Sequence, residues 1–341
     1  LDALLAPLDL VYPVFPGENS ASLGGNVATN AGGMRAVRYG VTRHQVLGLT
    51  AVLGTGEVIT TGGKFVKATS GYDLTQLVIG SEGTLAIATE AVLRLHPRMA
   101  HGATVLVPFP DLRHVADSIP RIVGSGLNPT ILEYIDFITM SAITNAAGLD
   151  LGVPQEVKDA AMAYLLVVIE NHVDARVEED TAALAELCFE LGGLDVYVLP
   201  PAAGAGLIDA REKAFWTAKA MNANEIVDVV VPRAEIPVYL DRCQEIAAEY
   251  GSFVVGCGHA GDGNVHLSVF QPDPDKCHAT MHGILAAGVA VGGAVSGEHG
   301  IGRAKKAHLA AIEDPTKIDL MRRIKAAFDP AHILNPGAIF D

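Results

Sequence analysis

Short apolar runs alternate with glycine-rich polar segments over residues 1–98. The runs LGLTAVL (47–53), EVITTGG (57–63) and TLAIATEAVLRLHP (84–97) have the length and composition of strands. The segment LDALLAPLDLVYPVFPG (1–17) has the pattern of a helix that leads into a strand. Glycine turns between such short strands predict an α+β domain whose loops approach a ligand closely.

Residues 99–314 alternate more regularly between strand and helix patterns. Strand patterns occupy 101–109, 163–171, 227–232, 252–260 and 264–270, and helical patterns occupy 111–126, 177–193, 233–251 and 276–290. This order predicts an antiparallel sheet with helices on one face, a ferredoxin-like arrangement. Residues 315–341 predict a short amphipathic helix and an extended Asn-Pro-Gly tail. We therefore divide the chain into parts 1–98, 99–314 and 315–341.

Composition narrows the function classes. The chain has 341 residues, of which 50% are hydrophobic and 18% charged, as in globular proteins with more than one core. Its formal net charge of −15 argues against a nucleic-acid partner, which needs a basic surface. No stretch has the ~20 apolar residues of a membrane helix, and the first residues lack the basic region of a signal peptide. The cysteines form no C-x-x-C pair, which favours reduced thiols and a cytoplasmic location; they are Cys188, Cys243, Cys257 and Cys277.

Two histidines flank a turn in CGHAGDGNVHLSV (257–269). If Asp262 and Gly263 form a two-residue primed turn, His259 lies directly opposite His266. Partners across a hairpin share a face with Cβ atoms ~4.5–5.5 Å apart, so two imidazoles could hold one metal ion. The alternative is a polar hairpin with two unrelated histidines, because a one-residue slip would place them on opposite faces.

A second cluster, SGEHGIGRAKK, places Glu298 and His299 between glycines. Two histidines and a carboxylate form a three-ligand set that leaves positions open for a substrate. His299 would then be available as an acid or base near neutral pH. The alternative is a helix N-terminus capped by serine, with an incidental histidine.

Two further features suggest ligand contacts. The glycine-rich segment 17–40 can expose backbone N–H groups to a phosphate or a flat cofactor, but it matches neither a Rossmann fingerprint nor a P-loop. It could equally be a surface loop. Arg211 is a candidate clamp for a substrate carboxylate, although a solvated helix arginine is the simpler interpretation from the residues alone.

Taken in order, five segments resemble the FAD-linked oxidases and dehydrogenases of the vanillyl-alcohol-oxidase type. They are PGENSASLGGNVATNAGG, YG…LGLTAVL…GEVI, GYDLTQLVIGSEGTLAIATEAVLRLHP, GHAGDGNVH and SGEHGIG. The resemblance is strongest to the branch that holds glycolate oxidase FAD subunits, D-lactate dehydrogenases (cytochrome) and D-2-hydroxyglutarate dehydrogenases. It implies part of a PCMH-type FAD-binding domain, followed by a ferredoxin-like α+β substrate domain.

The resemblance also implies roles for residues. His259, His266 and Glu298 match divalent-metal ligands (Zn, Mn or Fe), His299 matches the base, and Arg211 matches a substrate-carboxylate arginine. The implied FAD contacts are Pro16, Gly17, Ser22, Gly24, Gly25, Asn26, Thr29, Asn30, Gly32, Gly33, Tyr39, Gly40, Glu82, Gly83, Thr84, Leu85, Ile87 and Asn335.

Two departures from the family pattern shape the expected activity. No Arg-Gly-Gly-Gly-Thr-like pyrophosphate loop precedes LDALL, so we expect the first part of the FAD domain to be missing. The hydroxyglutarate enzymes add a Thr and a Lys to the carboxylate clamp, where this chain has Phe215 and a residue near Ile226. The expected substrate is therefore a small 2-hydroxy acid with one carboxylate, D-lactate or glycolate.

The expected reaction passes a hydride from C2 to the flavin, and then electrons to a quinone, cytochrome or iron–sulfur partner, with peripheral membrane association through that partner. Two other functions stay open from the sequence. One is a flavin-free metallohydrolase that uses His259, His266 and Glu298. The other is a truncated, non-catalytic remnant.

Overall fold

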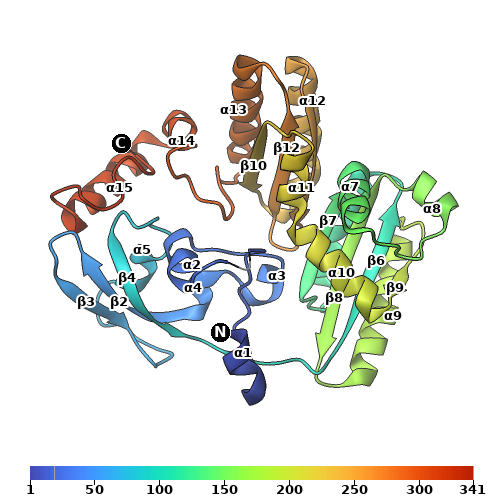
Figure 1. Cartoon of the computed structure of the whole chain (residues 1–341), viewed down its shortest axis with the longest axis horizontal. Coiled ribbons are helices and arrows are strands. Elements are labelled where there is room, and N and C mark those ends of the chain that lie inside the picture. The colour runs from blue at the N-terminus through green and yellow to red at the C-terminus, as the bar shows by residue number, and fades with distance from the viewer. Residues whose placement is uncertain (19, 341) are drawn as a thin grey trace. The chain divides into compact units, whose positions relative to one another are not determined.

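The computed structural model describes residues 1–18 and 20–340, which form two compact units. The first unit contains Leu1–Arg35, Tyr39–Arg98 and Glu298–Asp341, and the second contains Ala36–Arg38 and Met99–Gly297. Figure 1 traces the chain through them. The main segment of the second unit begins directly after Arg98. Residues 298–314, which the sequence analysis groups with the second part, cluster with the first unit.

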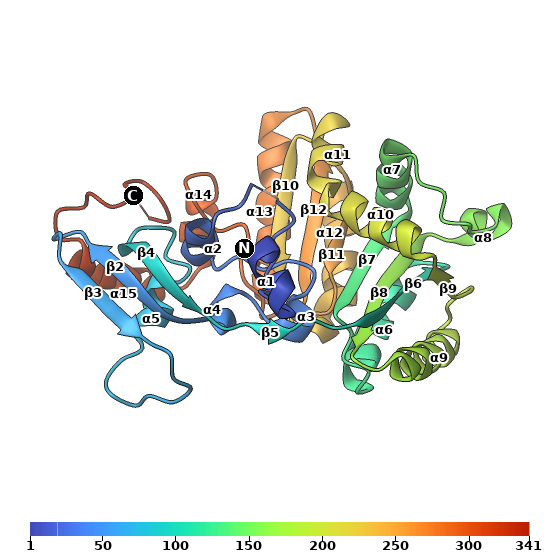
Figure 2. The ribbon, with the colours of Figure 1, turned by 60° about the horizontal axis from the view of Figure 1, so that its bottom comes forward.

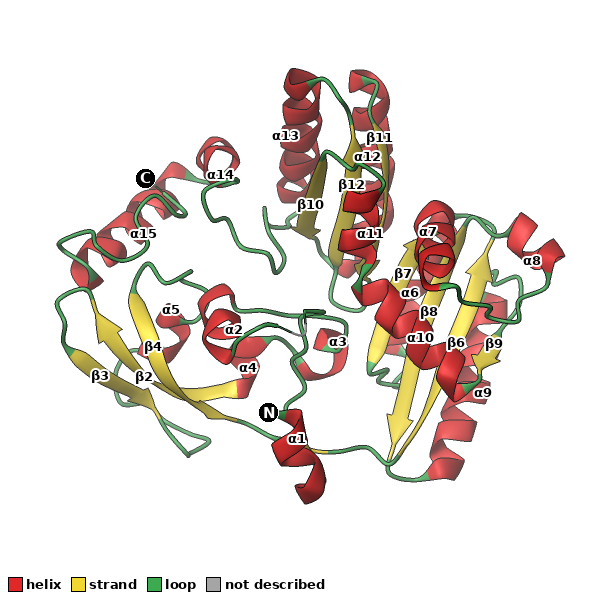
Figure 3. Ribbon diagram, viewed as in Figure 1, coloured by secondary structure: helices red, strands yellow, loops and turns green. Residues whose placement is uncertain are grey.

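The first unit is built on a three-stranded antiparallel sheet (Figure 3). Its order is β3 (Val58–Gly62), β2 (Val46–Leu53), β4 (Ala86–Leu93), and β1 (Leu10–Val11) pairs separately with β5 (His96–Pro97). The helices are α1 (Asp2–Leu5), α2 (Leu23–Thr29), α4 (Thr42–Gln45), α5 (Leu74–Val78), α14 (Lys306–Ile312) and α15 (Pro315–Phe328), with the 3-10 turn η1 (Ala6–Leu8).

Apolar residues of β2 form the core of this unit. Leu49 and Ala51 are buried against Val27 of α2 and Val78 of α5. Glycine is required at position 48, where the register between β2 and β4 shifts, because a Cβ there would lie 2.5 Å from the Thr61 carbonyl oxygen. Through Val27, the core also holds α2, which lies in the glycine-rich segment 17–40.

The second unit contains a seven-stranded antiparallel sheet with the order β10-β12-β11-β7-β8-β6-β9. The strands are β6 (His101–Phe109), β7 (Ile131–Asp136), β8 (Ala163–Asn171), β9 (Tyr197–Leu199), β10 (Glu225–Val230), β11 (Phe253–His259) and β12 (Asn264–Phe270). The strand β8 is an unbroken apolar run, AYLLVVI, and its first seven residues are buried. A strand buried on both sides needs cover on both faces of the sheet.

Helices accordingly pack on both faces, so the expectation of helices on one face is wrong (Figures 1 and 2). One face packs against α6 (Leu112–Gly124), α9 (Asp174–Glu190), α12 (Ile236–Tyr250) and α13 (Pro274–Ala290). The other packs against α7 (Phe137–Ala147) and α10 (Pro201–Glu212), with α8 (Gln155–Ala160) and α11 (Ala214–Ala220) beside them. The physical reason is the composition of α7 and α10, whose apolar residues complete a core with Leu106, Tyr164 and Leu166. Two short elements, α3 (Ala36–Tyr39) and η2 (Arg233–Glu235), complete the chain.

Candidate active site

The hairpin β11–β12 pairs with a register different from the predicted one. His259 is opposite Asn264, and His266 is opposite Cys257. The turn therefore contains four residues, 260–263, rather than the two of a primed turn. The prediction that His259 and His266 face each other directly is wrong, because the chain closes a longer loop and the pairing moves by two residues. A shift of two keeps side chains on the same face, so the histidines are diagonal neighbours with ring centroids 5.0 Å apart.

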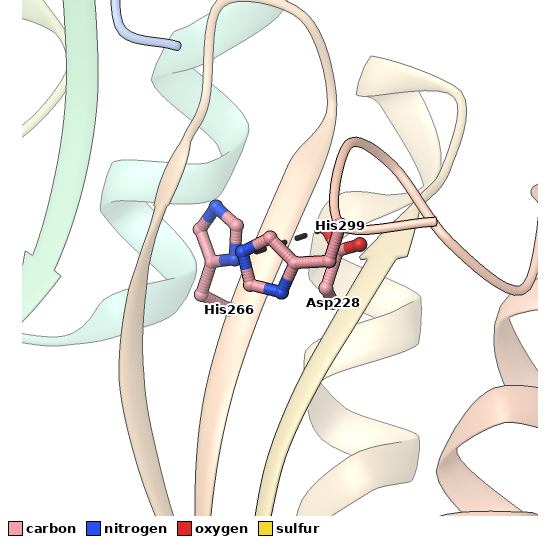
Figure 4. A group of neighbouring side chains, drawn as sticks. All are labelled: Asp228, His266 and His299. Carbon is pink, nitrogen blue, oxygen red and sulfur yellow. Dashed lines mark ion pairs between the residues drawn. The ribbon is translucent and has the colours of Figure 1, made fainter. Parts of the chain in front are cut away.

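These histidines belong to a row of polar side chains that crosses four strands on one face of the sheet. Asp228 on β10 is in register with His266, and its Oδ1 lies 3.8 Å from His266 Nδ1 (Figure 4). On the other side of the pair, Glu133 on β7 accepts a hydrogen bond from His259 Nδ1 at 2.7 Å. Its second oxygen lies 2.6 Å from Arg211 Nη2 on α10. The row thus runs from Asp228 through the two imidazoles to Glu133 and Arg211.

The charged side chains of the row are buried, so each of them needs its neighbour as a partner. Glu133 and Asp228 are fully buried, and Arg211 is 5% exposed. A charge in the interior is costly unless it is paired and hydrogen-bonded, so each member requires its neighbours. The simpler interpretation of Arg211 as a solvated helix arginine is wrong for this reason.

The sequence analysis missed Glu133 and Asp228. Each is a single acidic residue inside an apolar strand, in TILEYI and EIVDVVV. A charge at a buried strand position signals a functional or paired site, and that signal could have found both. The strand β7 itself was not predicted, which hid Glu133.

The Glu133 carboxylate orients the His259 imidazole for metal binding. A carboxylate accepts the proton of Nδ1, which leaves the lone pair on Nε2. Metal-binding histidines commonly have this second partner, which fixes the tautomer and the ring direction. The donor set therefore suits a divalent ion such as Zn²⁺, Mn²⁺ or Fe²⁺. Cys257 is a poorer ligand, because burial raises the pKa of its thiol and favours the neutral form.

The segment that carries Glu298 and His299 starts from the same row. Asp228 Oδ2 accepts hydrogen bonds from Ser296 Oγ at 2.6 Å and from Gly297 N at 3.1 Å. Glu298 follows Gly297 directly, so its Cα lies about 3.8 Å from that of Gly297 by covalent geometry alone. His299, also drawn in Figure 4, is the next residue. Residues 296–305 form a loop, so the alternative of a serine-capped helix start at this position is wrong.

Within the first unit, Glu298 meets the glycine-rich segment. A Cβ at Gly32 would lie 2.8 Å from Glu298 Oε2, so a side chain at this position would force the Glu298 carboxylate to move. Gly33 has φ +120° and also has no room for a side chain. At Gly24 the opposite holds, since no atom lies within 4 Å of a Cβ built there. Exposed backbone at Gly24 fits close approach by a flat cofactor.

The other predicted cofactor residues lie in the same unit. Ser22 caps α2 by accepting from Gly25 N, and Asn26 is buried inside that helix. Asn30 ends α2 in the left-handed region with φ 53°. Thr29 lies in α2 and Tyr39 ends α3. The remaining positions fall on loops or a strand start: Pro16 and Gly17, Gly40, 82–87, and Asn335, whose side chain donates to the Glu82 carbonyl oxygen at 2.6 Å. Among them Thr84 and Leu85 are buried and Ile87 is exposed.

Comparisons with known proteins identify the family. Residues 98–339 match the C-terminal domain of FAD linked oxidases, and residues 1–62 match an FAD binding domain. The chain belongs to the FAD-linked oxidases. This confirms the family resemblance and the α+β fold expected from it.

Relatives of this FAD-linked oxidase include named dehydrogenases. An uncharacterized FAD-linked oxidoreductase of Mycobacterium tuberculosis is 55% identical over 340 residues, which cover 100% of this chain and 74% of the relative. A D-lactate dehydrogenase of Archaeoglobus fulgidus is 36% identical over 97% of this chain and 72% of its own length. The glycolate oxidase subunit GlcD of Bacillus subtilis is 35% identical over 97% and 71%.

Solved structures share the fold at low sequence identity. A 4-ethylphenol oxidase from Gulosibacter chungangensis superimposes with a TM-score of 0.75 at 15% identity, over 99% of this chain and 73% of that one. An alkyldihydroxyacetonephosphate synthase gives 0.68 at 16% identity, and this chain spans 61% of its length. Among the described residues, no helix is long and apolar enough to cross a membrane.

Proposed function

We propose that this FAD-linked oxidase is a dehydrogenase of small 2-hydroxy acids, D-lactate or glycolate, which it oxidises to the 2-oxo acid. The observation that carries the proposal is the buried row in which Glu133 supports both His259 and Arg211. One carboxylate thereby orients a metal-ligand candidate and a substrate-carboxylate candidate together. The alternative of a flavin-free hydrolase leaves the glycine-rich first unit without a role.

In this proposal each residue of the row has a distinct task. His259 and His266 hold a divalent ion through Nε2, and Glu298 supplies the third ligand. A bound ion would make the 2-hydroxyl of the substrate more acidic, and FAD would supply the hydride acceptor for C2. His299 accepts the hydroxyl proton, so the acid loses one proton and one hydride in total, equal to two electrons.

Arg211 binds the substrate carboxylate. A guanidinium can grip a carboxylate through two parallel N–H donors. The fixed carboxylate of Glu133 holds the guanidinium plane and compensates its charge before the substrate arrives, which reduces the cost of reorganisation on binding. Glu133 and Asp228 therefore act by orientation, without touching the substrate.

The expected preference for a monocarboxylate rests on two positions. Phe215 on α11 is apolar, and Ile226 lies on the same face of β10 as Asp228, two residues away. Neither can offer a cation to a second carboxylate. After the reaction the electrons pass to a quinone, cytochrome or iron–sulfur protein, and a cytoplasmic location goes with this proposal.

The test measures metal, flavin and turnover separately. The purified chain is titrated with FAD and with Mn²⁺, and substrate oxidation is followed with a dye acceptor for D-lactate, glycolate and D-2-hydroxyglutarate. We expect saturable binding of both cofactors and a higher kcat/KM for the two monocarboxylates. Hydrolysis of an ester without flavin would overturn the proposal in favour of the hydrolase. Absence of saturable FAD binding would favour the non-catalytic alternative.

A further inference from the structure

Glu82 adopts a backbone conformation that a side-chain-bearing residue rarely takes. Its φ is 53°, in the left-handed region, where L-residues other than Gly, Asn and Asp are uncommon. Both of its backbone polar groups are bonded outside its own segment. The Glu82 N–H donates to the Ala28 carbonyl at 2.7 Å, at the end of α2, and its carbonyl accepts from Asn335 Nδ2 at 2.6 Å. Such a conformation persists only where surrounding contacts determine it.

The Glu82 carboxylate is also fully engaged. Oε1 accepts from Ile301 N at 2.7 Å, and Oε2 accepts from Gly302 N at 2.7 Å. Two parallel hydrogen bonds from consecutive backbone N–H groups to an ionised acceptor are among the stronger polar contacts in proteins. They hold a loop that has no helix or strand of its own between residues 296 and 305.

Glycines in the loop of residues 296–305 leave room for this carboxylate. A Cβ at Gly300 would lie 2.9 Å from Glu82 Oε1, so a side chain at that position would displace the carboxylate. Gly300 and Gly302 also have φ values of 78° and 54°, which favour glycine. The glycines on either side of Ile301 therefore allow the backbone to close on Glu82.

We infer that Glu82 is a positioning residue: its carboxylate fixes the loop that carries Glu298 and His299, and its backbone groups join that loop to α2 and to Asn335. Glu298 and His299 precede Ile301 by three and two residues. The hydrogen bonds of Ile301 and Gly302 to Glu82, called the anchor below, therefore limit how far Glu298 and His299 can move. The inference rests on the proposed function, because it takes Glu298 as a metal ligand. It gives the side chain of Glu82 a task other than contact with the cofactor.

The experiment compares Glu82→Gln with Glu90→Gln in the full chain. The two substitutions remove the same charge, but the Glu90 side chain accepts from Thr50 Oγ1 at an exposed site. Glutamine at position 82 keeps the size of the side chain but replaces one accepting oxygen by an N–H₂ donor. That donor faces a backbone N–H, so one of the two hydrogen bonds is lost. Hydrogen exchange of peptides that cover residues 297–303 reports the anchor, and Mn²⁺ titration reports Glu298.

With Glu82→Gln, we expect exchange in residues 297–303 to be about tenfold faster and Mn²⁺ affinity to be about tenfold to a hundredfold lower, the usual range for a residue that orients a ligand. Exchange in β8 and in β2 should not change. Glu90→Gln should leave both measurements at wild-type values. Gly300→Ala should act in the same direction as Glu82→Gln, because its methyl group displaces the same carboxylate.

Three outcomes separate the inference from the proposed function. Faster exchange with unchanged Mn²⁺ affinity would overturn the positioning role. Unchanged exchange would overturn the anchor itself. Failure of the wild-type chain to bind Mn²⁺ would instead overturn the metal site of the proposed function, and the exchange data would still decide whether Glu82 holds the loop.

Discussion

The two units position their candidate functional groups in different ways. In the second unit, side chains at regular strand positions form the row from Asp228 to Arg211, and the register of the sheet sets their spacing. In the first unit, backbone N–H groups of a glycine-rich loop donate hydrogen bonds to a single carboxylate, that of Glu82. The row of the second unit depends on many backbone hydrogen bonds between strands. The loops of the first unit depend on a few polar side-chain contacts.

This difference predicts how each unit tolerates change. A sheet resists displacement because strand pairing is distributed over many residues. A substitution in the row should therefore leave the strand register in place, even where it breaks a buried charge pair. Loops held by individual buried contacts should lose local order when one contact is removed.

His299→Ala should give the largest loss. Removal of a general base lowers the turnover rate by about 10²- to 10⁴-fold, while FAD and Mn²⁺ still bind. Steady-state kinetics with D-lactate, together with the two binding titrations, measure this. His172→Ala is the matched control, because His172 is exposed after β8. Wild-type turnover in His299→Ala would remove His299 from the mechanism.

Asp329→Asn should destabilise the first unit by about 3 kcal/mol, the scale for breaking a buried ion pair. Asp329 is fully buried and pairs with Lys325, which also donates to the carbonyl oxygens of Thr84 at 2.8 Å and Leu334 at 2.9 Å. Hydrogen exchange in β2 and β4 should accelerate, while exchange in β8 stays constant. Equal acceleration in both units would contradict the view that they are separately stabilised.

The same pair predicts a pH dependence. Burial works to raise the pKa of Asp329, but hydrogen bonds from Lys325 and from the backbone of Ile333 and Leu334 outweigh it and hold that pKa below its ordinary value. A depressed carboxyl pKa stabilises the fold above the unfolded value, near 4, and this contribution is lost as the pH falls through the folded value. Denaturant titrations from pH 6 to pH 3 should therefore show falling stability, with a shallower slope in Asp329→Asn.

Glu133→Gln should weaken Mn²⁺ binding by about tenfold to a hundredfold and raise the KM for D-lactate, because one carboxylate orients both His259 and Arg211. Calorimetry and kinetics measure the two effects, with Glu190→Gln on the exposed end of α9 as the control. A change in only one of the two quantities would show that the metal and substrate positions are independent.

Gly24→Ala should give the smallest effect on stability, and in the opposite direction. Alanine is favoured over glycine in a helix by about 0.5–1 kcal/mol, and a methyl group at this position meets no atom within 4 Å. Thermal unfolding should therefore be unchanged or slightly later. FAD affinity should fall, because the methyl group occupies the space that the cofactor would use. Unchanged FAD affinity would exclude close approach at Gly24.

Much of the fold follows from local pattern. Apolar runs with strand period predicted β2, β6, β8, β11 and β12, and caps and glycine stops predicted α6, α9 and α12. Other elements were not predicted, because β7 and α10 lack a clear period: β7 is buried on both faces, and α10 is rich in alanine and glycine. The second helical layer on the sheet consists mainly of α10 and α7, neither of which was predicted.

The sequence by itself determined the chemistry that is available. It placed two histidines around a hairpin, a Glu-His pair between glycines, and the motifs of an FAD-linked oxidase family along one chain. Only the tertiary structure decided which groups meet. The pairing of His259 with Glu133, of Glu133 with Arg211, and of Glu82 with Ile301 joins residues 126, 78 and 219 positions apart. Such contacts depend on strand register and on loop closure, which arise from packing of the whole chain and leave no periodic signal in it.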